Sequence, residues 1–304
     1  MTQPAPDGSV QDAAYAPAPP QRGATARVLA TLGGVLGLAA IGVGALFLVD
    51  LMMSETTTTH RTYDAVGTVE LVADGDVTVT AAEGDVEVDA VARSGLRDPR
   101  YSADESADRL EITHRCAWTA FLPRCSGALE VTLPAATEVV VVTENGDVVA
   151  SGLAGELSVR SSNGRIEVAD IGGAVVARSS NGDVTVRNAG SDVEASSSNG
   201  EVSVDEVDGS VTSESSNGRI TVGTVAGDAW ARTSNGSVEI SAVEGNVYGE
   251  TSNGRITVIG DGEPVALTLQ TSNGDEIIEG PTDPDADRTV EMRSSNGDVA
   301  YLVP

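Results

Sequence analysis

Residues 161–196 read SSNGRIEVADIGGAVVARSSNGDVTVRNAGSDVEAS, which is two copies of one 18-residue unit. Each copy contains two turns nine residues apart, and a short run of alternating apolar and polar residues follows each turn. After the turn at Asn181-Gly182, Val184 and Val186 point to one side of a strand, and Thr185 points to the other. The unit therefore predicts a turn, a short strand, a second turn and a second short strand.

The Asn-Gly pair continues on both sides of this stretch with a constant spacing of 18 residues. The asparagines in this series are Asn145, Asn163, Asn181, Asn199, Asn217, Asn235 and Asn253, and two further Asn-Gly pairs follow at Asn273 and Asn296. Asn-Gly is also the strongest short hairpin signal, so a meander of hairpins is the alternative fold. A meander needs no constant register, whereas the stacked coils of a solenoid must match at every position. We therefore predict an all-β chain, a parallel β-solenoid of 18-residue two-strand coils with a structural ladder of turn asparagines.

The two halves of each repeat differ in the size of their inward-facing residues. Four residues after the Asn-Gly glycines the side chains are mostly large, as at Val168 and Val186, and in the other half they are mostly small, as at Ala177 and Ala195. Large residues that face small ones would fill a thin core at normal density. The serine before each asparagine, such as Ser162 or Ser180, is expected to form a ladder of hydroxyls beside the asparagines.

The N-terminal part has a different composition. Residues 1–27 are rich in proline and predict a disordered cytoplasmic tail, and residues 28–49 contain no charged residue and are long enough to span a bilayer as a helix. Arg22 and Arg27 precede this span and Asp50 follows it, so the positive-inside rule predicts a single-pass membrane protein with a cytoplasmic N-terminus. A cleaved signal peptide is the alternative, but no small-x-small cleavage site follows. We expect a linker at 50–62 and an extracytoplasmic solenoid at 63–304.

Composition narrows the possible functions. Asp and Glu outnumber Lys and Arg by 46 to 18, giving a net charge of −28, and this excludes a nucleic-acid partner, which needs clustered cations. The two histidines, His60 and His114, lie outside the repeats, so no base is expected beside the repeated serines. We expect no catalytic residues, no metal site and no cofactor.

The chain resembles a bacterial family of candidate adhesins, which are β-strand-repeat domains of unknown function. The residues that carry the resemblance are Leu129 to Pro134, Val139 to Val148 and the repeated Ser-Ser-Asn-Gly-Asp/Arg-Val/Ile, and it extends over about residues 65–304. The resemblance implies a cell-surface solenoid that acts in adhesion or as an envelope scaffold. It implies no catalytic residues.

Two groups of residues are candidates for ligand binding. Cys116 and Cys125, within an insertion near 94–128, are expected to form a disulfide outside the cytoplasm, and the loop between them carries Trp118 and Phe121. This loop is interpreted either as a hydrophobic lid on the first coils or as a recognition loop. Trp230 and Tyr248 are one repeat apart, so their rings should be neighbours on one face, either for ligand contact or for cross-strand packing.

The sequence thus favours a membrane-anchored, adhesin-like or envelope-scaffold interaction module at the cell membrane. Its expected partners are a cell-wall, glycan or protein ligand on a surface, and the lipid bilayer through residues 28–49. Two alternatives are a carbohydrate-active β-helix enzyme and a calcium-binding β-roll. An 18-residue coil is too thin for a wide catalytic groove, and the repeats lack the Gly-Gly-x-Gly-x-Asp motif of calcium rolls.

Overall fold

The structure is a computed structural model that describes residues 24–52, 55–94, 99–116 and 125–303. It divides into two compact units, residues 1–48 and 49–304. The helix α1 (Ala24–Met52), most of which belongs to the first unit, includes the predicted span and also residues 24–27, which were expected in the disordered tail. The remainder of that tail lies outside the described residues.

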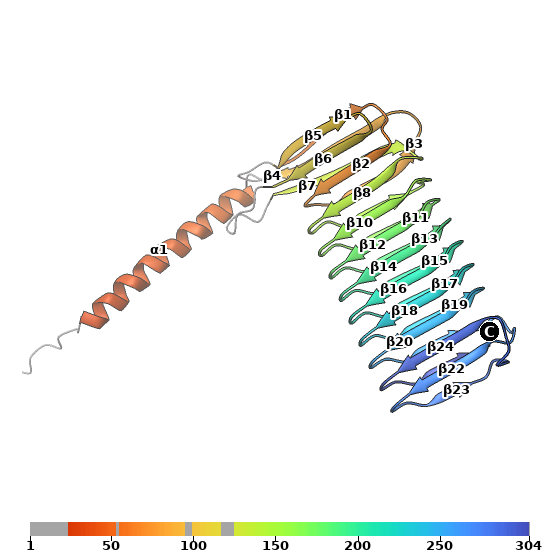
Figure 1. Ribbon diagram of the computed structural model, residues 1–304. Coiled ribbons are helices and arrows are strands. Elements are labelled where there is room, and N and C mark those ends of the chain that lie inside the picture. Colours follow the sequence, from red (N-terminus) through yellow and green to blue (C-terminus); the bar gives the residue numbers. More distant parts are fainter. Residues whose placement is uncertain (1–23, 53–54, 95–98, 117–124, 304) are drawn as a thin grey trace, which may run out of the picture. The chain divides into compact units, whose positions relative to one another are not determined.

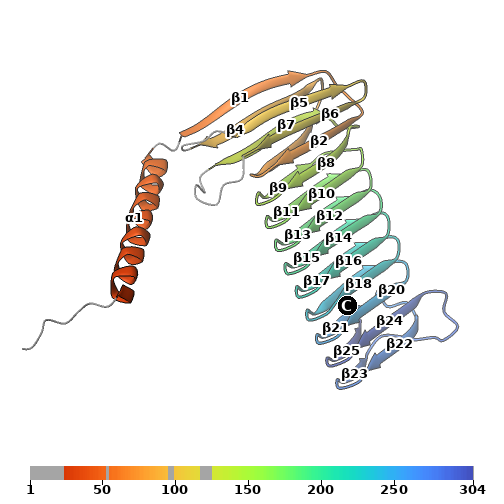
Figure 2. The same cartoon turned by 60° about the vertical axis from the view of Figure 1, so that its left-hand side comes forward.

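The second unit is built from two large sheets (Figures 1 and 2). Sheet A consists of β1 (Glu55–Tyr63), β3 (Val77–Ala82), β4 (Val86–Ser94), β7 (Ser126–Pro134), β9 (Val148–Ser151), β11 (Ile166–Ile171), β13 (Val184–Ala189), β15 (Val202–Val207), β17 (Ile220–Val225), β19 (Val238–Val243), β21 (Ile256–Ile259), β23 (Glu276–Ile278) and β25 (Val299–Leu302). Sheet B consists of β2 (Thr68–Ala73), β5 (Arg100–Ser106), β6 (Arg109–Arg115), β8 (Glu138–Thr143), β10 (Leu157–Ser161), β12 (Val175–Ser179), β14 (Val193–Ser197), β16 (Val211–Ser215), β18 (Ala229–Thr233), β20 (Val247–Thr251), β22 (Ala266–Thr271) and β24 (Thr289–Ser294).

The regular repeats stack as parallel coils, each formed by one strand of sheet B and the following strand of sheet A. β10 pairs in parallel with β12, and β11 with β13, so residues 18 apart lie side by side. Val159 is next to Ala177, and Val168 is next to Val186. The predicted parallel β-solenoid with two-strand coils is confirmed.

The first coils depart from sequence order. The coil β2–β3 lies between the coil β6–β7 and the coil β8–β9, so its two neighbours both come later in the chain. Antiparallel strands then cover this end: β4 pairs with β7, β1 pairs with β4, and β5 pairs with β6. The predicted linker at 50–62 is therefore corrected for residues 55–62, because the β-branched run Thr56 to Thr59 extends into β1 and pairs along its whole length with β4.

The last coils show the same kind of insertion. The chain passes from β21 to β22 and β23, then returns, so that β24 and β25 fill the space between β20–β21 and β22–β23. Arg288 holds this return by donating to both carboxylate oxygens of Asp261, at 2.7 and 2.9 Å, and to the carbonyl of Val243. The hydrogen bonds from Arg288 lower the pKa of Asp261 to about 2.

The core is the thin layer between the two sheets. Val168 and Val186 from sheet A, and Ala177 and Ala195 from sheet B, are all at most 2% exposed. At Gly249, in the column of small residues, an added Cβ would lie 3.1 Å from Cγ2 of Ile256 on the facing strand. Cδ1 of Ile240, which belongs to the predicted column of large residues, lies 3.9 Å from the same Cβ position, so a small residue here faces large ones from sheet A.

The glycines of the Asn-Gly corner are required by close stacking. A Cβ added to Gly200 would lie 2.2 Å from the carbonyl oxygen of Gly182, which is far inside van der Waals contact. The positive φ angles of the described non-glycine residues instead occur at the opposite corner, at Asp170 (57°) and its equivalents up to Ala242 (52°). Asp170 has no partner in the register between β11 and β13, whereas the residues on either side of it do. This local bulge turns the side chain of Ile171 into the core.

Two ladders of side chains connect the coils at the Asn-Gly corner. From Asn163 onward, the Nδ2 of each corner asparagine donates to Oδ1 of the asparagine in the neighbouring coil, as from Asn181 to Asn163 at 2.8 Å. The ladder follows spatial order at its end, so that Asn296 donates to Asn253, and Asn273 to Asn296. The hydroxyl ladder lies one residue earlier than predicted, because Ser179 points inward and bonds to the backbone of Gly164 and Gly182, whereas Ser180 is exposed.

Replacing Gly200 by alanine should lower stability by about 1–3 kcal/mol, because the new Cβ overlaps backbone that cannot rotate away. Gly223→Ala is the matched control, because the atom nearest to its added Cβ is Oδ1 of Asp205, which belongs to a side chain that can move away. We expect the control to change stability by no more than about 0.5 kcal/mol. Urea unfolding followed by circular dichroism measures both variants, and equal midpoints would contradict the stacking argument.

Candidate functional site

The aromatic pair, Trp230 and Tyr248, lies on the outer face of sheet B. The two residues are direct neighbours in the register of β18 and β20, and their inward neighbours Ala231 and Gly249 also pair. The ring centroids are 5.9 Å apart and the ring planes differ by 6°, so the rings are stacked in parallel. The structure therefore brings these two predicted residues together, each half-buried.

Charged side chains surround the aromatic pair. The Tyr248 hydroxyl donates to Oε2 of Glu250 at 2.7 Å, and Arg232 lies 3.4 Å from the other carboxylate oxygen of Glu250. Burial raises the pKa of Tyr248, and the hydrogen bond to Glu250 raises it further, so the hydroxyl remains a neutral donor. On the next strand, Glu291 lies beside Tyr248 in the register and forms an ion pair with Arg293.

The sequence reasoning missed these four charged residues. Arg232 and Glu250 come two residues after Trp230 and Tyr248, and this spacing places them on the same face of a strand. That signal was available for both residues. Glu291 and Arg293 could not be found in this way, because β24 is adjacent to β20 only through the chain reversal.

The second candidate site is the disulfide loop between β6 and β7. Cys116 and Cys125 are bonded, with their Cα atoms 5.9 Å apart, which confirms the predicted disulfide. Trp118 and Phe121 lie outside the described residues. What the structure describes is the neck of this loop, formed by Cys116, Gly127 and Asp74.

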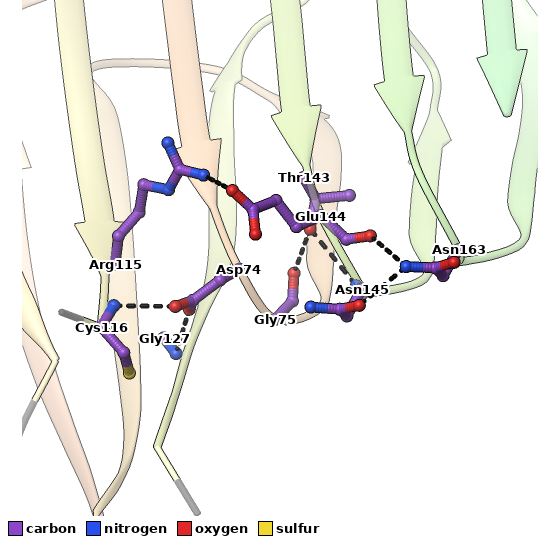
Figure 3. Close-up of polar contacts among 10 residues, drawn as sticks. Asp74, Gly75, Arg115, Cys116, Gly127, Thr143, Glu144, Asn145 and Asn163 are labelled. Atoms are coloured by element: carbon purple, nitrogen blue, oxygen red, sulfur yellow. Dashed lines mark hydrogen bonds and ion pairs between the residues drawn. The ribbon is translucent and has the colours of Figure 1, made fainter. Parts of the chain in front are cut away.

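Asp74 closes the neck from the adjacent coil (Figure 3). Its carboxylate accepts from the N–H of Cys116 at 2.7 Å and from the N–H of Gly127 at 2.9 Å. Asp74-Gly75 occupies the place of an Asn-Gly corner, since a Cβ added to Gly146 would lie 1.9 Å from the Gly75 carbonyl oxygen. Arg115 adds an ion pair with Glu144, and the Thr143 hydroxyl donates to the Gly75 carbonyl at 2.9 Å.

Aromatic and basic residues close the end of the core beside this neck. His114 is 2% exposed, and its Nδ1–H donates to the Ala128 carbonyl at 3.0 Å. Burial lowers the pKa of His114, so the ring stays neutral. The hydroxyls of Tyr63 on β1 and Tyr101 on β5 are 2.7 Å apart, and the Arg61 guanidinium lies 4.6 Å from the Tyr101 ring centroid. These contacts join the terminal strands of sheets A and B.

Over the described ranges, no group of three or more His, Cys, Asp or Glu side chains is placed to hold a metal ion. The acidic run near the C-terminus makes local contacts instead. Asp283 accepts from the N–H of Asp285 at 2.9 Å, and Arg288 is engaged with Asp261.

Comparisons with known proteins find one family and several solved structures. The model of the family described as Toastrack DUF4097 matches residues 67–240. Among solved structures, the chain is similar to a candidate adhesin from Bacteroides fragilis, with 12% identity, a TM-score of 0.45 and coverage of 82% of this chain and 97% of that one. It is also similar to a candidate lipid-binding protein from Parabacteroides distasonis, with 11% identity, a TM-score of 0.45 and coverage of 81% and 96%. No curated protein sequence matches the chain significantly.

Asp74→Asn should loosen the loop neck, because the amide cannot accept both N–H groups as the carboxylate does. Loss of one charge-assisted hydrogen bond costs about 1.5–3 kcal/mol. We expect faster hydrogen exchange at Cys116 and Gly127 and a lower thermal midpoint. Asp85→Asn, at an exposed turn, is the control with the same charge change. Unchanged exchange at both amides would show that Asp74 does not hold the neck.

Proposed function

Since this chain belongs to the Toastrack DUF4097 family, we propose that it is a membrane-anchored interaction module of the cell surface, acting in adhesion or envelope scaffolding without catalysis. The solenoid presents side chains from a rigid stack of coils. Its outer faces carry mainly Ser, Thr, Val and charged residues, and the aromatic pair stands out among them.

The observation that carries this proposal is the aromatic pair with its charged frame. Binding energy at protein surfaces concentrates in Trp, Tyr and Arg residues, with contributions of ~2 kcal/mol or more when they become buried. Trp230 and Tyr248 are held by strand pairing and by stacking, so little conformational entropy is lost when a ligand covers them. Arg232 and Glu250 add hydrogen-bonding groups at the rim, which suits a glycan or a polar protein surface.

The positions of possible catalytic groups support a non-catalytic role. The repeated serines lie at the corners of the coils, and the inward ones, such as Ser179, bond to backbone groups. The two histidines lie on β1 and β6, where His60 contacts Asp89 and His114 contacts Ala128. A nucleophilic serine needs a positioned base, and the described histidines do not supply one.

The helix α1 supports the membrane anchor. Residues Leu32–Val49 have a mean hydropathy of 2.3 and are long enough to cross a bilayer. A signal sequence would have the same character, and the proposal of an uncleaved anchor rests on the missing cleavage site.

Truncation of both Trp230 and Tyr248 to alanine should weaken binding to cell-wall or host-surface material at least about tenfold, since two anchors are lost. Co-sedimentation of the full chain with these materials measures the effect. Thr185→Ala with Thr221→Ala, two half-buried outward residues on sheet A, is the matched control and should bind normally. A large drop in the thermal midpoint of the aromatic variant would assign the pair to sheet packing. Unchanged binding would show that Trp230 and Tyr248 do not form the binding site.

Identifying the N-terminus of the mature protein in cells tests whether the helix is an uncleaved membrane anchor. We expect mass spectrometry of the membrane fraction to recover peptides from residues 1–27, because the apolar helix stays attached. A mature N-terminus between residues 50 and 62 would instead identify a cleaved signal peptide.

A further inference from the structure

The coil formed by β22 and β23, here called the terminal coil, leaves its inward side chains uncovered. It comes last in both sheets. Ile278 is 55% exposed, although Tyr301, its neighbour in the register, is completely buried. Leu267 and Leu269 are partly buried, although their neighbours Val290 and Met292 are at most 4% exposed.

The backbone of β22 is also open on its outer edge. The N–H of Ala266 donates to the backbone carbonyl of Arg288 on the β24 side, and the carbonyl of Val265 accepts from the backbone N–H of Asp283 on the opposite side. Alternate residues of a strand direct their backbone groups to opposite edges. The N–H and C=O groups of Leu267 and Leu269 therefore face the outer edge, where no described strand pairs with them.

The opposite end of the solenoid is closed. Antiparallel β4, β1 and β5 cover the first coils, and the Tyr63–Tyr101 hydrogen bond joins the two sheets there. Leu110 and Leu129, beneath this cover, are completely buried. The two ends therefore differ, and the open core is specific to the terminal coil.

The residues around the terminal coil carry a net negative charge, which favours a cationic partner. Residues 261–287 contain eight Asp and Glu residues and no Lys or Arg. Glu276 stands in the inward column beside buried Val299, and inward-pointing charges on an edge strand oppose pairing with a second acidic copy. A cationic partner is attracted by the same charges.

We propose that the outer edge of β22 receives an extended segment of another protein in which apolar residues alternate with Lys or Arg. Such a segment adds a strand to sheet B through main-chain hydrogen bonds at Leu267 and Leu269. Its apolar side chains cover these leucines and Ile278, and its cations are attracted by the net negative charge of residues 261–287. This strand-addition site is separate from the aromatic pair, on other strands.

A synthetic ten-residue peptide of alternating valine and arginine tests the site on the full chain in detergent micelles. We expect it to bind at least about tenfold more tightly than a peptide of the same composition with the valines and arginines in two blocks, because alternation matches the strand geometry. Hydrogen exchange should slow at Leu267 and Leu269. Equal affinity of the two peptides, or unchanged exchange in residues 266–271, overturns the proposal.

A triple variant with three carboxylates neutralised tests the contribution of charge to peptide binding. Asp275→Asn with Glu276→Gln and Glu279→Gln should weaken binding roughly tenfold at low salt. The matched control, Glu201→Gln with Glu214→Gln and Glu239→Gln, removes the same charge in the middle of the solenoid and should have little effect. Equal losses in both triple variants would indicate diffuse attraction and overturn the site.

Leu269→Pro removes an N–H that faces the outer edge while leaving the bonds to β24 in place, and it should abolish the slowed exchange. Light scattering without peptide tests whether a second copy of the chain occupies the edge of β22 instead. A concentration-dependent dimer with slowed exchange in β22 would show that a second copy covers the edge, and the proposal would be wrong.

Discussion

The close approach of backbone at the Asn-Gly corner is the constraint on which the rest of the solenoid depends. A glycine carbonyl oxygen in one coil lies only 2.2 Å from the place that a Cβ of the next coil would take, as at Gly182 and Gly200, so each coil must follow the path of its neighbour. This repetition aligns Asn181 with Asn163 and Ser179 with Gly164, and their hydrogen bonds then satisfy the turn. The same alignment places Trp230 against Tyr248.

Polar side chains at the corners stabilise the stack by satisfying backbone groups. Asp147 accepts from the N–H of Arg165 at 2.7 Å, and Asp228 accepts from the N–H of Asn246 at 2.7 Å. Carboxylates that accept from backbone N–H groups of the next coil recur at several coils, and this accounts for part of the chain's acidity. A large negative charge is thus compatible with a tightly stacked fold.

Periodicity predicted most of the solenoid, because residues such as Val168 and Ala177 repeat in identical surroundings. The ends were not predictable in this way. Asp74-Gly75 has no periodic link to Asn145-Gly146, yet the two corners stack, and β24 lies between strands that precede it in the chain. The aromatic pair followed from the 18-residue spacing, whereas the contribution of Arg293 and Glu291 depended on this long-range topology. The position of the hydroxyl ladder was missed by one residue because the turn directs Ser179 inward.

The reversed order of the last coils affects how the chain can fold as it is synthesised. Each regular coil finds its neighbour already made, so the central stack can grow one coil at a time. β22 and β23 have no such neighbour, because β24 and β25 must be placed between them and β20–β21. This end therefore cannot close until residues 289–302 have been synthesised. Until then, the free edges of β20 and β21 are the part of the nascent stack most exposed to mispairing with other strands.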